Sequence, residues 1–313
     1  MIVSQLCREK DFHQSWYRDW IAACYQPFHL HRKQWEHVAI AQALEERGLL
    51  RPGMRGLGFG VGQEPLPALF ASRGCDIVAT DLPLDRAGSL EWSRTNEHSS
   101  TAATLNRSGI CPPETFDRRV TFRFEDMNSI SADLVDFDFT WSSCALEHLG
   151  SLDAGWSFLL DQHRCLKPGG WAVHTTEYNV FSDHRTWASG STVLYRKRDL
   201  LVLQRAARTR GLELEALDLS LGDLPNDFFI DYWPYHASPH LKLLVADEFV
   251  TTSIVLILKK VREPSEPRSP IAIDASGFTA PGHHRIPTQP VLAASDGEDD
   301  TLEHLRSERD AWR

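Results

Sequence analysis

The stretch of sequence that decides the fold is Gly56-Leu57-Gly58-Phe59-Gly60-Val61-Gly62-Gln63-Glu64-Pro65. It runs from a short apolar segment through a glycine-rich loop into a helical segment, which Pro65 opens and Gly74 closes. The glycines let the backbone turn tightly and let a ligand approach the main chain without a Cβ in the way. A strand, a loop and a helix in this order predict a ligand-binding turn; a tight turn that binds nothing is the alternative.

Beyond this loop, short apolar runs alternate with helical stretches. The expected strands cover residues 56–59, 76–80, 120–124, 137–141, 170–175, 212–217 and 251–258. The expected helices between them cover residues 64–73, 153–166 and 198–210. Strands that alternate with helices predict an α/β fold with a doubly wound, mainly parallel sheet.

An arm precedes the α/β unit. Apolar residues recur at three- and four-residue spacing from Trp16 onward and again from Trp35 onward, with Pro27 between the two series. This spacing is typical of helices, and a proline interrupts them. Residues 1–53 are therefore expected to form an N-terminal helical arm.

The composition changes after the α/β unit, which we assign to residues 54–261. Residues 262–300 are rich in proline, serine, glycine and aspartate, which predicts an acidic, proline-rich linker or disordered tail. Residues 301–313 resemble the start of a C-terminal helix. We expect this tail to be the part of the chain that contacts a protein partner.

The overall composition is that of a soluble globular protein. Hydrophobic residues make up 42% of the chain, and no apolar run approaches the roughly 18 residues of a membrane span. The formal net charge of −10 disfavours nonspecific binding to nucleic acid or to an anionic membrane. The N-terminus lacks the features of a signal peptide, and the 6 cysteines form no Cys-x-x-Cys pair. We therefore expect a cytoplasmic protein with no membrane insertion and no nucleic-acid partner.

The glycine loop does not fit a dinucleotide. A dinucleotide fingerprint requires Gly-x-Gly-x-x-Gly, but the sixth positions counted from Gly58 and Gly60 are Gln63 and Pro65. Glu64 also stands where a pyrophosphate would bind at the start of the helix, and its carboxylate would repel phosphate. A ligand with an amino group and a sulfonium is compatible with this carboxylate, so the loop favours S-adenosylmethionine over NAD.

Asp81 ends the next expected strand, roughly 20 residues after the glycines. An acidic side chain at this place can accept hydrogen bonds from both hydroxyls of a ribose. An aspartate in a surface turn is the alternative, and the glycine loop upstream makes it the weaker one.

Three further segments follow the later strands in order. They are Glu125-Asp126-Met127 after the third strand, Trp141-Ser142-Ser143-Cys144-Ala145-Leu146-Glu147-His148-Leu149 after the fourth, and Leu166-Lys167-Pro168-Gly169-Gly170 before the fifth. Together with the glycine loop and Asp81, they resemble the ordered motifs of class I S-adenosylmethionine-dependent methyltransferases. The resemblance implies a seven-stranded, Rossmann-like methyltransferase sheet.

The resemblance also implies which residues hold S-adenosylmethionine. In that family the counterparts of Asp126 and Met127 bracket the adenine, and the residue at Ser142 lies near the methionine moiety. The cofactor-binding residues expected here are therefore Gly58, Gly60, Gly62, Asp81, Asp126, Met127 and Ser142. Two positions depart from the family, because Gly58 replaces a frequent acidic residue and Glu64 replaces a third glycine. The amino-acid end of the cofactor is thus expected to be held differently here.

Residues 35–66 are also similar to methyltransferases found with glycosyltransferases in bacterial surface-polysaccharide assembly. This similarity implies O-methylation of a carbohydrate or small-molecule hydroxyl. N-methylation of a small amine and a non-catalytic, cofactor-binding scaffold are the alternatives. An NAD(P)-dependent oxidoreductase is disfavoured by the missing third glycine and by Glu64.

Methyl transfer to a hydroxyl needs a general base, because an alcohol is a poor nucleophile at neutral pH. The residues that act on the acceptor should follow the fourth and fifth strands or lie in inserts over them. The candidates are His148, Glu177 and, as the preferred base, His236. His148 can instead cap a helix beside the cofactor. The aromatic insert at residues 228–240 is either a lid that stacks on a sugar or packing between sheet and helices.

Four of the polar residues in these segments are possible metal ligands. They are Glu177, Asp231, His236 and His240. Their spacing fits no recognised ligand pattern, so no metal is expected.

Overall fold

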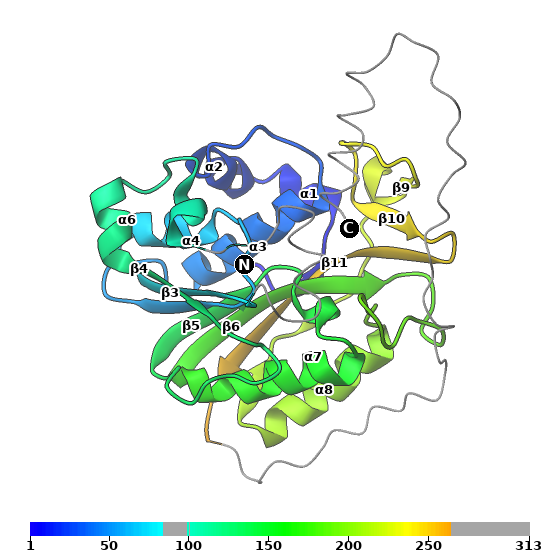
Figure 1. The fold of residues 1–313 in the computed structure, drawn as a ribbon. Helices are drawn as coiled ribbons and strands as arrows, with labels where there is room; N and C mark the ends of the chain where they lie inside the picture. The colour runs from blue at the N-terminus through cyan, green and yellow to red at the C-terminus, as the bar shows by residue number, and fades with distance from the viewer. Residues whose placement is uncertain (84–98, 100, 264–313) are drawn as a thin grey trace, which may run out of the picture.

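The computed structural model describes residues 1–83, 99 and 101–263 (Figure 1). The C-terminal helix expected at 301–313 and nearly all of the linker expected at 262–300 lie outside the described residues. Within the described part, the chain forms one mixed sheet with helices on both faces. The predicted α/β fold is confirmed.

Five parallel strands form the centre of the sheet. In spatial order they are β4 (Val120–Phe124), β3 (Asp76–Asp81), β2 (Arg55–Gly58), β5 (Phe137–Ser142) and β6 (Leu166–Asn179). The chain builds outward from β2 to β3 and β4 on one side and then returns to place β5 on the other. Such a reversal of strand order opens a crevice at the carboxyl ends of the strands.

The long strand β11 (Phe249–Lys260) runs antiparallel along β6, from the pair Thr251–Asn179 to the pair Lys259–Trp171. Three short strands share its other edge, all antiparallel to it. They are β7 (Leu212–Leu214), β1 (Ser4–Leu6) and β10 (Lys242–Val245). Two more strands extend this side, β8 (Leu217–Asp218) beside β1 and β9 (Ile230–Asp231) beside β10.

The predicted count of seven strands is wrong, because the sheet of the described residues has 11 strands and is antiparallel around β11. The expected segments supply the path β4-β3-β2-β5-β6-β11 together with β7. The additional strands β1, β8, β9 and β10 have 3, 2, 2 and 4 residues. Segments this short show no measurable alternation of apolar and polar residues, so the sequence does not reveal them. Because β1 belongs to residues 1–53, the arm also contributes to the sheet.

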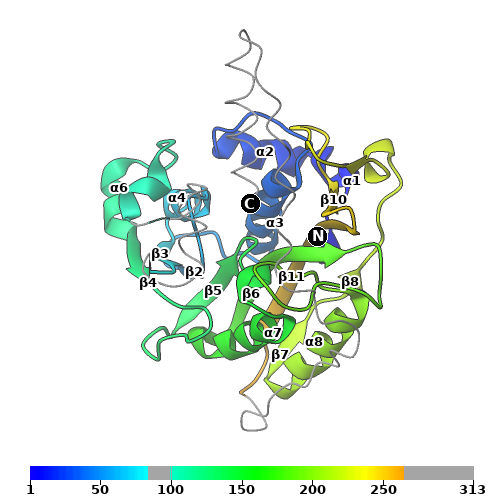
Figure 2. The same cartoon turned by 45° about the vertical axis from the view of Figure 1, so that its right-hand side comes forward.

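Helices cover both faces of the sheet (Figures 1 and 2). On one face lie α3 (Arg32–Glu46), α4 (Leu66–Ser72) and α6 (Pro113–Arg119), and on the other lie α7 (Leu152–Asp161) and α8 (Lys197–Thr209). The short helices α1 (Glu9–Phe12) and α2 (Ser15–Ala23) lie near α3. No helix among the described residues combines the length and the apolar character that a membrane span requires.

Aromatic rings on β5 explain the glycines of β2. A Cβ at Gly56 would lie 2.4 Å from Phe139 Cζ, and a Cβ at Gly58 would lie 2.4 Å from Trp141 Cζ2. Both rings are buried and pack edge to face against Phe70 of α4, at centroid distances of 5.7 Å and 5.1 Å. Strand β2 therefore carries glycine where these rings pack against it.

Strand β6 begins earlier than expected. Its first residue is Leu166, so the Lys-Pro-Gly-Gly segment lies inside the strand. The pairing with β5 shifts register between Phe137 and Phe139, and Gly169 takes a φ of +82°. The segment is therefore an irregularity within β6, whereas the sequence analysis placed it before the strand.

Gly155 in α7 makes room for the ring of Tyr195, which stacks on Trp156 at 4.1 Å. A Cβ at Gly155 would lie 1.9 Å from the hydroxyl oxygen of Tyr195. We predict that Gly155→Ala lowers the free energy of unfolding by about 1–3 kcal/mol, the usual cost of an overpacked core, as measured by urea denaturation. In a Tyr195→Phe background, which removes the hydroxyl, the loss should be smaller. An equal loss in both backgrounds would contradict the steric explanation.

Candidate functional site

The glycine loop and two later loops meet at the carboxyl edge of the sheet. In the loop after β2, Gly60 has a φ of +58° and Gly62 a φ of +49°, a conformation that favours glycine. A Cβ at Gly60 would lie 3.0 Å from Ala145 Cβ and 3.4 Å from Met127 Sδ. The structure thus brings the loop after β2, the segment after β4 and the loop after β5 to one place.

Asp81 ends β3 and is 8% exposed. Its carboxylate accepts hydrogen bonds from the backbone N–H groups of Leu82 at 2.8 Å and Ser99 at 2.9 Å. The N–H of Glu125 donates to the carbonyl oxygen of Asp81 at 2.8 Å, which ties the end of β3 to the segment after β4. The carboxylate is therefore held in place at the end of β3.

The segment after β4 forms a tight turn. The carboxylate of Asp126 accepts from the N–H of Asn128 at 2.8 Å, and that of Glu125 accepts from the N–H of Ser131 at 2.6 Å. Met127 is buried with its sulfur toward Gly60, while Asp126 is partly exposed. An apolar wall with a polar rim suits a flat heteroaromatic ring.

Ser142 does not present its side chain to this place. The residue is fully buried, and its hydroxyl lies 2.8 Å from Nδ1 of His174. The side-chain amide of Gln162 donates to Nε2 of His174 at 2.7 Å, so Nδ1 carries the proton and donates to Ser142. Because its hydroxyl is part of an interior network, the contact predicted between Ser142 and the methionine moiety gains no support from the structure.

Glu64 differs from its predicted state. The residue is 8% exposed, and the indole N–H of Trp141 donates to its Oε1 at 2.6 Å. Burial, with smaller contributions from the charges of Asp81 and Glu36, raises the pKa of Glu64 to about 8, while the Trp141 hydrogen bond opposes the rise. The carboxyl is therefore largely protonated at neutral pH, and the expectation that its charge repels a pyrophosphate is wrong for the structure as it stands.

A second group of polar residues lies near the carboxyl end of β6, where the start of α3 packs against the sheet. Glu177 is 6% exposed and forms an ion pair with Arg32 of the arm, and the hydroxyl of Thr251 also donates to its carboxylate. Both oxygens of Glu177 are therefore engaged. Arg32 is buried as well, at 6% exposed, so this pair joins the arm to the sheet.

Glu36 stands one turn further along α3 and is fully buried. Lys33 Nζ lies 3.6 Å from its Oε2, and Arg32 Nη1 lies 3.8 Å from its Oε1. Ser253 donates to the same carboxylate. Although burial alone would raise the pKa of Glu36, Lys33 and Arg32 lower it below its usual value. The carboxylate is therefore ionised.

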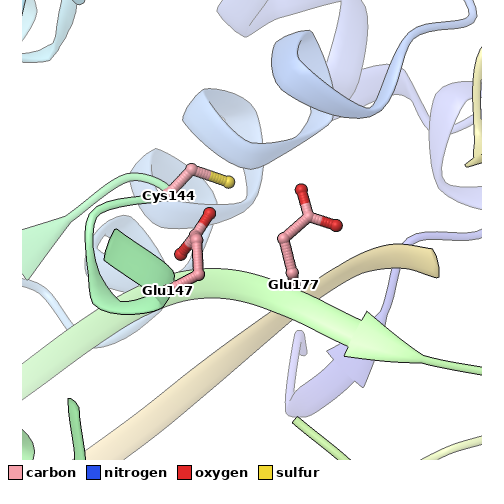
Figure 3. Close-up of side chains that lie close together, drawn as sticks. All are labelled: Cys144, Glu147 and Glu177. Carbon is pink, nitrogen blue, oxygen red and sulfur yellow. The ribbon is translucent and has the colours of Figure 1, made fainter. Parts of the chain in front are cut away.

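Glu147 completes this group from the loop after β5 (Figure 3). Its Oε2 accepts from the hydroxyl of Thr176 at 2.8 Å, whereas its buried Oε1 has no hydrogen-bond partner among the described residues. Burial raises the pKa of Glu147 to about 7; Lys33 opposes this rise and Glu177 adds to it. A carboxyl with one unbonded oxygen and a pKa near neutrality is suited to proton transfer.

His148 lies beside Glu147, with Nε2 at 3.9 Å from Oε1 of that carboxyl. Its Nδ1 lies 2.7 Å from the carbonyl oxygen of Ser191, which can only accept, so Nδ1 carries the proton. Burial lowers the pKa of His148 to about 4, and the ring is therefore neutral at physiological pH. The ring packs in a loop contact rather than capping a long helix, since Leu146–His148 form only a short 3-10 turn.

Three potential metal ligands, Cys144, Glu147 and Glu177, have ligand atoms within 4.8 Å of one another (Figure 3). They differ from the set considered from sequence, which shares only Glu177 with them. The cations Arg32 and Lys33 already lie beside these acids, and the oxygens of Glu177 are taken. This donor set fits a divalent cation poorly.

The aromatic insert lies at the outer side of β10 and holds a separate histidine group. Asp231 accepts from His236 Nδ1 at 2.7 Å and from His240 Nδ1 at 2.6 Å. The His240 ring stacks on His31 at 4.4 Å, and the N–H of Arg32 donates to the His240 carbonyl oxygen at 3.0 Å. The insert therefore touches the start of α3, which also reaches Glu177.

The side chain of His236, the preferred base from sequence, is 57% exposed and engaged with Asp231. The large rings of the insert are also exposed, with Phe228 at 70%, Tyr232 at 59% and Trp233 at 51%. Rings this exposed do not pack between sheet and helices. That the insert is a lid that stacks on a sugar stays a prediction.

The sequence did not single out Arg32, Lys33, Glu36 or Glu147 as functional residues. Arg32, Lys33 and Glu36 lie on a helix of the arm and carry no motif. Glu147 lies in the segment from Trp141 to Leu149. Its position next to the candidate His148 is the only feature of the sequence that could have identified it. Their proximity arises from the packing of α3 on β6 and β11, which no local pattern encodes.

Comparisons with known proteins give similarities of fold. No family model matches the chain, and no curated protein does. Solved structures that resemble it include an S-adenosylmethionine-dependent methyltransferase from Mesorhizobium loti, with 15% identity over 70% of this chain and 96% of that one and a TM-score of 0.43. The magnesium protoporphyrin IX methyltransferase of Synechocystis PCC 6803, with bound S-adenosylhomocysteine, has 10% identity over 80% and 97% of the two chains and a TM-score of 0.42.

A third is phosphoethanolamine N-methyltransferase 2 of Haemonchus contortus, solved with S-adenosylhomocysteine, with 22% identity and a TM-score of 0.38. The match covers 56% of this chain and spans 37% of the length of that protein. All three are methyltransferases. At these identities the likeness concerns the fold, so a function for this chain rests on its own residues.

The buried pair of Arg32 and Glu177 gives a test of how the arm is joined to the sheet. We predict that Arg32→Met lowers the free energy of unfolding by about 3–5 kcal/mol in urea denaturation, because it leaves the buried carboxylate of Glu177 without its cation. The control is Arg185→Met, whose exposed pair with Glu248 should contribute less than about 1 kcal/mol. Similar losses in the two variants would show that the buried pair does not join arm and sheet.

Proposed function

We propose that this chain is an S-adenosylmethionine-dependent methyltransferase of the class I type. The observation that carries the proposal is the meeting of Gly60, Met127 and Ala145 beside Asp81 at the carboxyl edge of the sheet. This is the edge at which open α/β sheets bind ligands, at the point where strand order reverses. The order of motifs along the sequence supports the same cofactor.

The residues present fit this cofactor. Asp81 would accept the ribose hydroxyls, and Met127 with the rim at Asp126 would enclose the adenine. Gly60 leaves room for the ligand where a Cβ would already meet Ala145. When bound, S-adenosylmethionine supplies a methyl group already activated on a sulfonium. The task left to the protein is to orient the acceptor and to take up a proton.

Glu147 is the residue that would take up this proton. In transfer to a hydroxyl, the bound cofactor would supply the methyl group, and Oε1 of Glu147 would accept the proton that the hydroxyl loses. This oxygen is buried without a hydrogen bond, in the loop that also supplies Ala145 to the cofactor edge.

The other candidates are less suited to act as the base. Glu177 forms an ion pair with Arg32 and accepts a hydrogen bond from Thr251, so both of its oxygens are already engaged. We propose instead that Arg32, the first residue of α3, and its partner Glu177 position the acceptor. His236 is largely exposed on the insert, and we assign it no proton in the reaction.

The acceptor we propose is a hydroxyl of a carbohydrate or of another small molecule. A base is needed for a hydroxyl and is less important for an unprotonated amine. The exposed rings of Tyr232 and Trp233 offer the apolar faces on which sugars stack. The insert that carries them touches α3 through His240, next to Arg32. An association with surface-polysaccharide assembly rests on the sequence similarity alone.

The cofactor assignment is tested by calorimetry. We expect S-adenosylmethionine and S-adenosylhomocysteine to bind and NAD not to bind. Asp81→Asn should weaken binding roughly tenfold, because a charge-assisted hydrogen bond to ribose becomes a neutral one. The matched control is Asp76→Asn at the other end of β3, where the side chain is 55% exposed and should leave affinity unchanged. Binding of NAD without binding of S-adenosylmethionine would refute the proposal.

The role of Glu147 is tested by label transfer from methyl-labelled cofactor to a panel of glycosides, phenols and amines. With the best hydroxyl acceptor, we expect Glu147→Gln to lower kcat about 10²–10⁴-fold, and His236→Ala to change it little. The wild-type rate should rise with pH through about 7, because Glu147 accepts a proton only when ionised. The variant should lack this rise.

The same panel separates the alternatives. Methylation of amines alone, at equal rates in wild type and Glu147→Gln, would indicate an N-methyltransferase. Binding of the cofactor without transfer to any acceptor would indicate a scaffold module.

A further inference from the structure

The chain lacks the acidic side chain that the resemblance leads one to expect at the end of β2. That position is Gly58, and the structure leaves no space there for any side chain. A Cβ would lie 2.4 Å from Trp141 Cζ2 and 2.6 Å from Val61 Cγ1. The indole of Trp141, which packs against Phe70 at 5.1 Å, fills the volume beside Gly58.

A different carboxyl reaches this indole from the far side of the loop. Glu64 closes the glycine turn, since its N–H donates to the carbonyl oxygen of Val61 at 3.1 Å. Its Oε1 accepts from the Trp141 indole at 2.6 Å. No hydrogen bond from the described residues reaches Oε2, although more than nine-tenths of the residue is buried. One carboxyl oxygen of Glu64 is therefore left without a hydrogen bond from the described residues.

The charges around this oxygen are complementary to a cation. The ionisable groups that act on Glu64 are Asp81 at the end of β3 and Glu36 of α3, and both are acidic. Burial and these two neighbours raise the pKa of Glu64 to about 8, while the Trp141 hydrogen bond opposes the rise. No cation of the described residues acts on Glu64, so the carboxyl keeps its proton at neutral pH. A cationic ligand beside it would favour the ionised form.

We propose that Glu64, held by Trp141, replaces the missing acid at position 58 and binds the α-ammonium group of the cofactor as a carboxylate, releasing its proton when the cofactor binds. The inference rests on the proposed function, because it names the group that grips the amino-acid end of S-adenosylmethionine. The proton leaves Glu64 for solvent, and the ammonium then donates to the free carboxylate oxygen. No other bond changes.

Proton release is measured by isothermal calorimetry at pH 7 in two buffers with different heats of ionisation. Wild type should release about one proton on binding S-adenosylmethionine or S-adenosylhomocysteine, both of which carry the ammonium. Glu64→Gln can still accept from Trp141 and should therefore fold, but it should bind both ligands about tenfold more weakly and release no proton from this site. The matched control Glu114→Gln, on the exposed side of α6, should behave as wild type.

The probe that isolates the amino-acid end is 5′-methylthioadenosine, which has the adenosine and the sulfur but no ammonium. It should bind wild type and Glu64→Gln with equal affinity and release no proton from either. Equal affinity of S-adenosylmethionine for wild type and Glu64→Gln, or proton release with 5′-methylthioadenosine, overturns the inference. If wild type binds none of the three ligands, the proposed function falls and the inference falls with it.

Discussion

The indole of Trp141 is the element on which the rest of the site depends. Its ring lies against Gly58, packs edge to face on Phe70, and donates its N–H to Glu64. The contact with Gly58 leaves no space for a side chain at the end of β2. The hydrogen bond to Glu64 orients the carboxyl that follows the glycine turn. One buried ring thereby sets both departures of this chain from the motif that it resembles.

The second constraint is electrostatic and comes from the arm. Helix α3 brings Arg32 and Lys33 over the ends of β6 and β11, where they face Glu177 and Glu36. Burying one such charge alone would cost several kcal/mol, so each of these charges depends on its oppositely charged neighbours for stability. Within this group, Oε1 of Glu147 is a buried oxygen that has no hydrogen-bond partner among the described residues. The arm thus contributes Arg32, Lys33 and Glu36 to the site, and it contributes β1 to the sheet.

The structure divides the polar residues of the carboxyl edge into two environments. Beside the glycine loop, the charges of the described residues that act on Glu64 are those of Asp81 and Glu36, which suits a positively charged ligand. Under α3, cations and carboxylates alternate, which suits a polar, uncharged acceptor. The aromatic insert adjoins the second environment through the contact of His240 with His31 and Arg32.

Much of this architecture follows from local sequence. The glycine loop, the alternation of apolar runs and helical stretches, and Asp81 at a strand end are short-range patterns, because a turn, a strand and a cap each depend on neighbouring residues. They determined the α/β class, the central parallel strands and the place of the glycine loop and Asp81. The short strands β1, β8, β9 and β10 escaped because they are too brief to show a period.

The identity of the acting side chains was decided by tertiary structure alone. Ser142 is the last residue of β5, yet its hydroxyl turns to His174. His236 lies in the aromatic insert, yet most of its side chain is exposed to solvent. Conversely, Arg32 and Glu177 are separated by more than a hundred positions and meet only because α3 packs on β6. The protonation state of Glu64 also depends on tertiary structure. From the sequence we expected a charged carboxylate, but burial and the charges of Asp81 and Glu36 raise its pKa and keep the carboxyl neutral. Sequence specifies which chemical groups are available, but desolvation and through-space charge, which give those groups their function, exist only after the chain has folded.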